Sequence, residues 1–168
     1  MQFLAAVAIK EALEEKAGVN VKLKWPNDLV LENLKLGGML VESKTVGDNI
    51  SFVILGIGVN VNQSKGQLPS GAVSLILSSG RRNDLRALLK TILDQIRSWY
   101  ADLANPSAIM EEWWRNCVHR SLRVRIAMPS GSVTGVSTGI DEEGGLMLET
   151  EDHKIRKVSE GSLTLLDD

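Results

Sequence analysis

The pattern of apolar residues changes between Val118 and Ser121, and this change constrains the fold more than any other feature of the sequence. Upstream, apolar residues recur with helical and strand spacings over long segments. Downstream, every apolar run is short, alternates with polar residues and is followed by a turn signal, which is typical of a small β-barrel. We therefore predict an α+β domain over residues 1–118 and an all-β domain over residues 119–168. The strands expected in the second domain are 122–128, 133–140, 146–149, 154–158 and 163–166.

The first domain is expected to combine helices with a mixed sheet. Helical spacing of apolar residues predicts three helices, at 3–16, 85–103 and 106–114. Alternating or β-branched runs predict four strands, at 21–24, 29–31, 35–42 and 50–61. The last run is so continuously apolar that we expect a strand buried on both faces. The first helix has no capping residue, so we expect it to enter from a longer chain and to leave an apolar face open.

Composition excludes several classes of protein. The formal net charge is -2, so the sequence indicates no broad basic surface for nucleic acid. The single cysteine, Cys117, cannot form an internal disulfide, which fits a reducing compartment. No apolar run approaches the roughly 20 residues of a membrane helix, and the first residues lack the features of a signal peptide. We expect a cytoplasmic protein without a membrane or nucleic-acid partner.

The densest cluster of special residues is Lys24 to Asp28, with the sequence Lys-Trp-Pro-Asn-Asp. Pro26 cannot continue a central ladder, and Asn27 and Asp28 favour a turn. Lys24 then stands at a strand end as a fixed cation that could hold a phosphate or a carboxylate. The alternative is a surface lysine beside a core tryptophan and an ordinary turn.

A second segment of interest is Gly56 to Asn60, with the pattern Gly-x-Gly-x-Asn. It is not a dinucleotide-binding fingerprint, because the third glycine is missing and strand-like residues follow. Gly58 could let a ligand approach the strand closely, and Asn60 offers both a donor and an acceptor. The alternative is a sheet glycine that accommodates a bulge.

Other constellations indicate no further chemistry. The spacing of histidine, cysteine and acidic residues does not indicate a metal site. Cys117 and His119 are two residues apart and would point in different directions on a helix, so we expect no nucleophile–base pair there. The pair Trp113-Trp114 is expected to anchor a helix to the core.

Three blocks together resemble the central signature of biotin protein ligases, the biotin–[acetyl-CoA-carboxylase] ligase family. They are Lys24 to Asp28, Lys35 to Glu42 (Lys-Leu-Gly-Gly-Met-Leu-Val-Glu) and Gly56 to Asn62 (Gly-Ile-Gly-Val-Asn-Val-Asn). The resemblance implies the C-terminal two-thirds of the catalytic domain, with a truncated mixed sheet and helices, followed by a small SH3-like β-barrel. It extends from the first helix to Leu166.

The resemblance also implies a reaction. Family members join biotin to ATP, which gives biotinyl-5'-AMP, and then transfer biotin to a lysine of the biotin carboxyl carrier protein. It implies that Lys24 contacts the biotin carboxylate and the α-phosphate, that Asn60 with Gly58 binds the adenylate, and that Lys35 assists near the phosphates. Trp25, Pro26, Asn27 and Asp28 form the motif turn, and Mg²⁺ accompanies ATP.

The sequence departs from the family in ways that affect this expectation. The Gly-Arg-Gly-Arg loop that closes over biotin in the family has no counterpart here, and neither do two strands of the biotin cradle. A biotin site without most of its wall is expected to bind poorly. We therefore expect the chain to need an N-terminal complementing chain or a homodimer.

Two alternatives to a complemented ligase remain at this stage. One is a non-catalytic, ligase-derived module that binds a nucleotide or the carrier protein. The other is a lipoate ligase-type relative, against which the intact Lys-Trp-Pro-Asn-Asp block argues.

Overall fold

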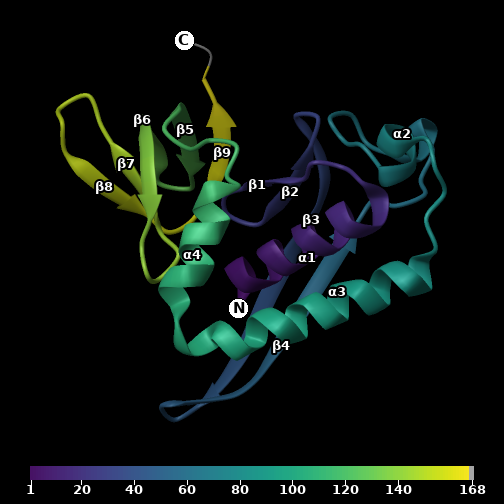
Figure 1. Ribbon diagram of the computed structural model, residues 1–168. Helices are drawn as coiled ribbons and strands as arrows, with labels where there is room; N and C mark the ends of the chain where they lie inside the picture. Colours follow the sequence, from purple (N-terminus) through teal and green to yellow (C-terminus); the bar gives the residue numbers. More distant parts are fainter. Residues whose placement is uncertain (167–168) are drawn as a thin grey trace.

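The computed structural model describes residues 1–166 and contains two antiparallel sheets with helices between and beside them (Figure 1). The first sheet has the order β1-β2-β3-β4, and the second has the order β8-β7-β6-β5-β9. This arrangement confirms the predicted α+β class with an all-β C-terminal part. The strands of the first sheet are β1 (Lys22–Lys24), β2 (Asp28–Leu31), β3 (Leu34–Val46) and β4 (Asn49–Val59). Those of the second are β5 (Arg123–Met128), β6 (Gly131–Ile140), β7 (Leu146–Glu149), β8 (Ile155–Val158) and β9 (Ser162–Leu165).

The helices begin and end largely where capping chemistry predicts. They are α1 (Gln2–Ala17), α2 (Leu75–Ser79), α3 (Leu85–Tyr100) and α4 (Pro106–Arg115). Gly18 ends α1 with a φ of 67°, and the Asp84 carboxylate accepts the first free N–H groups of α3. The five residues of α2 were not predicted, because such a short helix carries no readable periodicity. Within the described residues, none of the helices has the combination of length and hydropathy that a membrane span needs.

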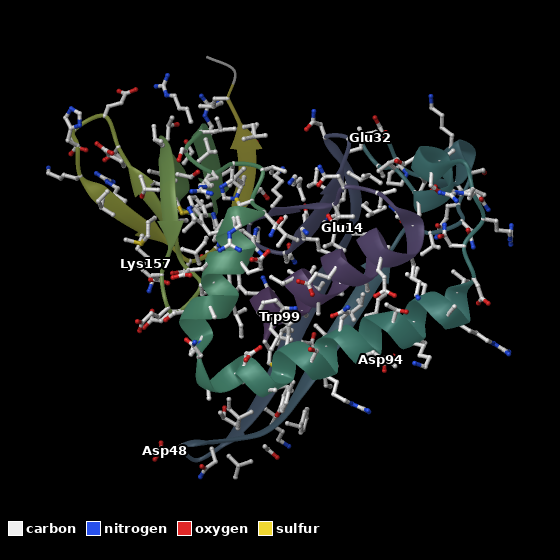
Figure 2. All side chains as sticks on the ribbon, in the orientation of Figure 1. Glu14, Glu32, Asp48, Asp94, Trp99 and Lys157 are labelled. Atoms are coloured by element: carbon white, nitrogen blue, oxygen red, sulfur yellow. The ribbon has the colours of Figure 1, made fainter. Side chains whose placement is uncertain are left out.

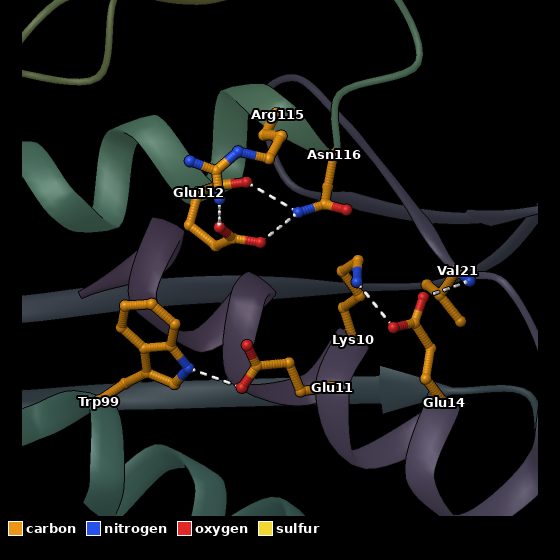
Figure 3. Close-up of polar contacts among 8 residues, drawn as sticks. All are labelled: Lys10, Glu11, Glu14, Val21, Trp99, Glu112, Arg115 and Asn116. Carbon is orange, nitrogen blue, oxygen red and sulfur yellow. Dashed lines mark hydrogen bonds and ion pairs between the residues drawn. The ribbon is translucent and has the colours of Figure 1, made fainter.

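The helix α1 is the central element of the first domain. It contacts β1, β2 and β3 as well as α3 and α4, and the side chains from Leu4 to Ile9 are almost fully buried. Three of its polar side chains form specific contacts: Lys10 pairs with Glu14 at 2.7 Å, and Glu11 accepts the indole N–H of Trp99 at 2.8 Å (Figure 3). The expectation that α1 leaves an apolar face open is therefore wrong, because α3 and α4 cover it.

The strand β4 is exposed along nearly its whole length, so the prediction of a strand buried on both faces is wrong. It pairs only with β3 and forms one edge of the first sheet. The hairpin of β3 and β4 extends beyond α3, with Asp48 at its tip (Figures 1 and 2). Ile50, Phe52 and Ile54 are exposed by 65%, 48% and 53%. Their apolar character was read correctly, but the described residues provide no layer that covers them.

The second sheet contacts α4, and its buried residues belong to the same hydrophobic core as those of the first domain. Val124, Ile126, Leu146 and Leu148 are fully buried in it. All five strands of the predicted barrel are present in the predicted order along the chain. Among the described residues the hydrogen-bonded pairs leave β8 and β9 as the two edges, so the sheet does not close through a β8–β9 ladder.

Candidate functional site

The turn between β1 and β2 is formed by the Lys24 to Asp28 block. Lys24 is half-buried at the end of β1, and the Trp25–Pro26 peptide bond is cis. The Trp25 side chain is 1% exposed, and its indole N–H donates to the carbonyl of Gly144 at 3.0 Å. The Pro26 carbonyl accepts from the Gln2 side chain at 2.6 Å. The turn is thus held by α1 and by the second sheet, which fixes the direction in which Lys24 leaves β1.

Asn27 and Asp28 join this turn to β3. The Asn27 side-chain amide donates to the Met39 carbonyl at 2.8 Å, and the Met39 N–H donates back to the Asn27 carbonyl at 3.0 Å. Asp28 forms an ion pair with Lys35 at 2.5 Å. Lys35 is the more exposed partner, with 56% of its side chain accessible, so its ammonium lies at the surface beside the Asp28 carboxylate.

Two glycines of β3 allow close backbone packing, Gly37 against β4 and Gly38 against the turn. A Cβ atom on Gly37 would overlap the carbonyl oxygen of Gly58, and one on Gly38 would lie 3.1 Å from the carbonyl oxygen of Asn27. Only glycine fits at Gly37 without displacing backbone. The alternative in which Gly58 accommodates a bulge is not supported at this position, because Gly58 pairs in regular register with Gly38.

Asn60 lies where β4 leaves the sheet. Its N–H donates to the Leu36 carbonyl at 2.9 Å, and its side-chain nitrogen donates to the Val73 carbonyl at 3.1 Å. The side chain therefore ties the end of β4 to the segment before α2. This bond uses one of the two amide N–H groups, so the oxygen and the second N–H remain for a ligand.

These residues line one open cavity of about 720 Å³ over β3 and β4. The structure brings Asn27, Asp28, Lys35, Gly58 and Asn60 together in its wall. It does not bring Lys24, Trp25 or Pro26 into the same wall. Trp25 is buried as a core residue, and Lys24 pairs across β1 and β2 with Asp28, which does line the cavity.

Gln63 also lines this cavity and was missed by the sequence analysis. Its Oε1 is buried and is the one buried side-chain oxygen or nitrogen in the described residues that has no hydrogen-bond partner. Buried acceptors are normally paired, so a donor from a ligand or from water is expected there. The only sequence signal was its position three residues after Asn60, within a loop that we treated as irregular.

Two groups with shifted pKa values lie behind the turn, outside the cavity. Burial raises the pKa of the Cys117 thiol to about 12, which keeps it protonated and unreactive. Burial, and secondarily the positive charge of Lys24, lower the pKa of His119 to about 4. Over residues 1–166, no group of three or more histidine, cysteine or acidic side chains could hold a metal ion. The single carboxylate in the cavity wall suits a Mg²⁺ ion that arrives with nucleotide phosphates.

Comparison with known proteins identifies the class to which this fold and this cavity belong. Residues 1–60 match the profile of the biotin/lipoate A/B protein ligase family, and residues 123–163 match that of the biotin protein ligase C-terminal domain. The chain belongs to the biotin protein ligase family.

Individual relatives agree with this assignment. The chain is 32% identical to the bifunctional ligase/repressor BirA of Bacillus subtilis over 98% of its own length and 52% of that protein. It is 34% identical to the biotin–[acetyl-CoA-carboxylase] ligase of Mycobacterium tuberculosis over 76% of its own length and 47% of that protein. The chain thus spans about half the length of these curated relatives.

Solved structures extend the similarity to the whole fold. The apo biotin protein ligase of Aquifex aeolicus superimposes with a TM-score of 0.82 at 25% identity, covering 99% of this chain and 74% of that one. The same ligase in complex with biotin and ATP superimposes with a TM-score of 0.79 at 26% identity, covering 100% of this chain and 72% of that one.

Proposed function

We propose that this chain carries the adenylate-forming centre of a biotin protein ligase. In this reaction a carboxylate oxygen of biotin attacks the α-phosphorus of ATP and the bond to the β-phosphate breaks, which gives biotinyl-5'-AMP and pyrophosphate. A lysine amine of the biotin carboxyl carrier protein then attacks the biotinyl carbonyl, and AMP leaves. The observation that carries the proposal is the joint presence of Lys24 on its strand and of the cavity with Asn60 and Lys35, in a fold that matches a ligase solved with biotin and ATP.

Each candidate residue has a role that its surroundings support. Lys24 offers a fixed ammonium between two anions, the biotin carboxylate and the α-phosphate, and its charge offsets their repulsion. Asn60, with Gly58 beside it, offers an amide oxygen and close backbone approach for the adenylate. Lys35 supplies a second cation at the rim, with Asp28 as its counter-ion. Mg²⁺ enters bound to the phosphates of ATP.

We also propose that the open apolar surface binds further polypeptide. We define this surface as exposed apolar side chains on one face of the β3–β4 hairpin, namely Leu40, Ile50, Phe52 and Ile54. A long exposed apolar edge strand is rare in folded proteins, because it can pair with strands of other chains and cause aggregation. The ligase relatives contain polypeptide outside the matched half, and we propose that its counterpart covers this surface, in the same chain or as a separate one. A second copy of the chain is the competing occupant.

The two domains are proposed to meet at residues 118 and 119, with an SH3-like fold in the second. Segment 116–118 hydrogen-bonds to Leu23 of β1, and β5 begins at Arg123, which supports a boundary there.

The experiment that tests the proposed function is carrier biotinylation. The 168-residue chain is mixed with the non-matching part of a ligase relative, ATP, Mg²⁺, biotin and a carrier domain, and biotin on the acceptor lysine is measured by mass spectrometry. We expect ATP-dependent biotinylation in the complete mixture. ATP binding without any biotin transfer would instead favour the non-catalytic binding module.

A further inference from the structure

His119 is a fully buried histidine, outside the candidate cavity, that connects the two sheets. It follows α4 and precedes β5, and it has no exposed surface. Its Nε2 accepts the backbone N–H of Trp25 at 3.1 Å, and its Nδ1 lies 3.3 Å from the Ser137 hydroxyl on β6. One ring thus contacts the first sheet through one nitrogen and the second sheet through the other.

The hydrogen bonds around His119 determine which nitrogen carries the proton. Ser137 has one hydroxyl hydrogen, and it donates this hydrogen to the His119 carbonyl. The Ser137 oxygen is therefore an acceptor toward the ring, so Nδ1 must be protonated. Nε2 then has the lone pair that accepts the Trp25 N–H. Ser137 selects the tautomer in which His119 can hold Trp25, as a neighbour of a ring nitrogen commonly does.

The bond to His119 completes the attachment of the strand that carries Lys24. On the side of β1 away from β2, the Leu23 N–H donates to Asn116 at 3.0 Å, and the Leu23 carbonyl accepts from Val118 at 2.9 Å. A parallel ladder would continue with the N–H of Trp25 donating to a backbone carbonyl. Here that N–H donates to the His119 ring. The peptide bond between Lys24 and Trp25 is therefore oriented by a side chain.

The second sheet holds Trp25 at two points. Its β6–β7 turn accepts the Trp25 indole N–H through the Gly144 carbonyl at 3.0 Å. Its strand β6 holds the Trp25 backbone N–H indirectly, through Ser137 and His119. Trp113 and Trp114 pack around the ring, with centroids 6.2 and 6.0 Å from it, and His119 has no exposed surface.

We propose that His119 is a positioning residue through which the second sheet fixes the direction of Lys24. This inference rests on the proposed role of Lys24 in adenylate formation. His119 does not touch the cavity and transfers no proton. It acts by holding one peptide plane, and with it the starting direction of the lysine side chain.

The variants His119→Met and His119→Gln test the proposal. Met fills the space of the ring and offers only a weakly accepting thioether, whereas Gln places an amide oxygen close to the position of Nε2. In the assembly used for carrier biotinylation, we expect His119→Met to lower kcat for pyrophosphate release by about 10-fold to 100-fold, as misplacement of a reacting group does. The KM for ATP should change less than about threefold, because the Asn60 side is untouched. His119→Gln should recover most of kcat, and His153→Gln, at an exposed histidine, should have no effect.

Amide exchange and ring ¹⁵N shifts of the 168-residue chain provide a readout besides activity. We expect a neutral ring protonated on Nδ1, and faster exchange of the Trp25 amide in His119→Met but not in His119→Gln. A ring protonated on Nε2 would overturn the proposal even if no variant folds, because Nε2 could not then accept from Trp25. Unchanged kcat in a folded His119→Met variant would also overturn it. Full activity of Lys24→Ala would instead remove the proposed function on which the inference rests.

Discussion

The two ends of the first sheet have opposite surroundings. At β1 and β2, Leu23 and Leu29 are fully buried, and the strands are held by α1, by segment 116–119 and by the second sheet. At the far end of β3 and β4, Ile50 and Val46 are exposed by 65% and 63%. The signature blocks lie where the buried part gives way to the exposed part. This contrast supports our proposal that the chain fixes Lys24 and the nucleotide side itself, and that other polypeptide encloses the remainder of the site.

The largest effect is expected from the buried end, at Lys24. Lys24→Ala should lower biotinyl-adenylate formation in the complemented assembly by about 10²-fold to 10³-fold, because it removes a fixed charge from the transition state. Folding should be unchanged by circular dichroism, since the Lys24 side chain is not part of the core. Lys22→Ala, on the same strand, is the matched control and should retain activity. Equal loss in both variants would show that a general charge effect, and not Lys24, is responsible.

Shortening a side chain should lower the free energy of unfolding much more at the buried end of the sheet than at the exposed end. Leu23→Ala should lower the free energy of unfolding by about 2–5 kcal/mol, because it leaves a cavity in a packed core. Ile54→Ala, at a residue that is 53% exposed, should cost less than about 1 kcal/mol in the isolated chain. Urea unfolding of both variants measures the difference. A large cost for Ile54→Ala would mean that the exposed end is already covered, by self-association.

Acid should weaken the buried end through His119. Its pKa is lowered from 6.5 to about 4 by burial and by Lys24, so the unfolded chain binds a proton in this range while the folded chain does not. The neutral His119 ring therefore contributes fully to the free energy of unfolding above pH 6.5. This contribution falls by on the order of 3 kcal/mol as the pH is lowered toward 4. We would measure the free energy of unfolding of the natural chain and of His119→Gln across this pH range. The difference between the two profiles gives the contribution of His119. Parallel pH profiles would contradict it.

The smallest effect on stability, with a clear effect on association, is expected at the exposed end. Phe52→Ser combined with Ile54→Ser should change the unfolding free energy by no more than about 0.5 kcal/mol per site. It should lower the binding of a hydrophobic dye and reduce self-association in light scattering, because it interrupts the open apolar surface. Thr45→Ser, on the same hairpin, serves as a control. A monomeric natural chain that binds no dye would contradict the proposed docking surface.

Much of this fold could be predicted because its signals are local. The positions of Gly18 and Asp84 at helix ends, and the alternation in the second sheet, depend on neighbouring residues alone. The exposure of β4 could not be predicted, because an apolar β-branched run has the same appearance whether its cover lies in this chain or elsewhere. The packing of α1 depends on α3 and α4, which lie far along the sequence.

The candidate site divides in the same way. The signature blocks identified Asn27, Asp28, Lys35 and Asn60, and the structure brings these residues into one cavity. Lys24 is not one of the residues that line this cavity, although it pairs with Asp28, which is. Gln63 could be recognised only from its place in the cavity wall, and His119 only from its hydrogen bond to Trp25. Neither contact can be read from spacing in the sequence.

The central claim is that the chain holds Lys24 and the nucleotide side ready but needs a cover to complete the biotin side. Biotin-dependent release of pyrophosphate from ATP tests it most directly. It should be measured on the 168-residue chain alone and after addition of the non-matching part of a ligase relative. We predict release in the mixture that depends on biotin and on Lys24, and little or none from the chain alone. Release by the chain alone at the rate of the mixture would contradict the claim.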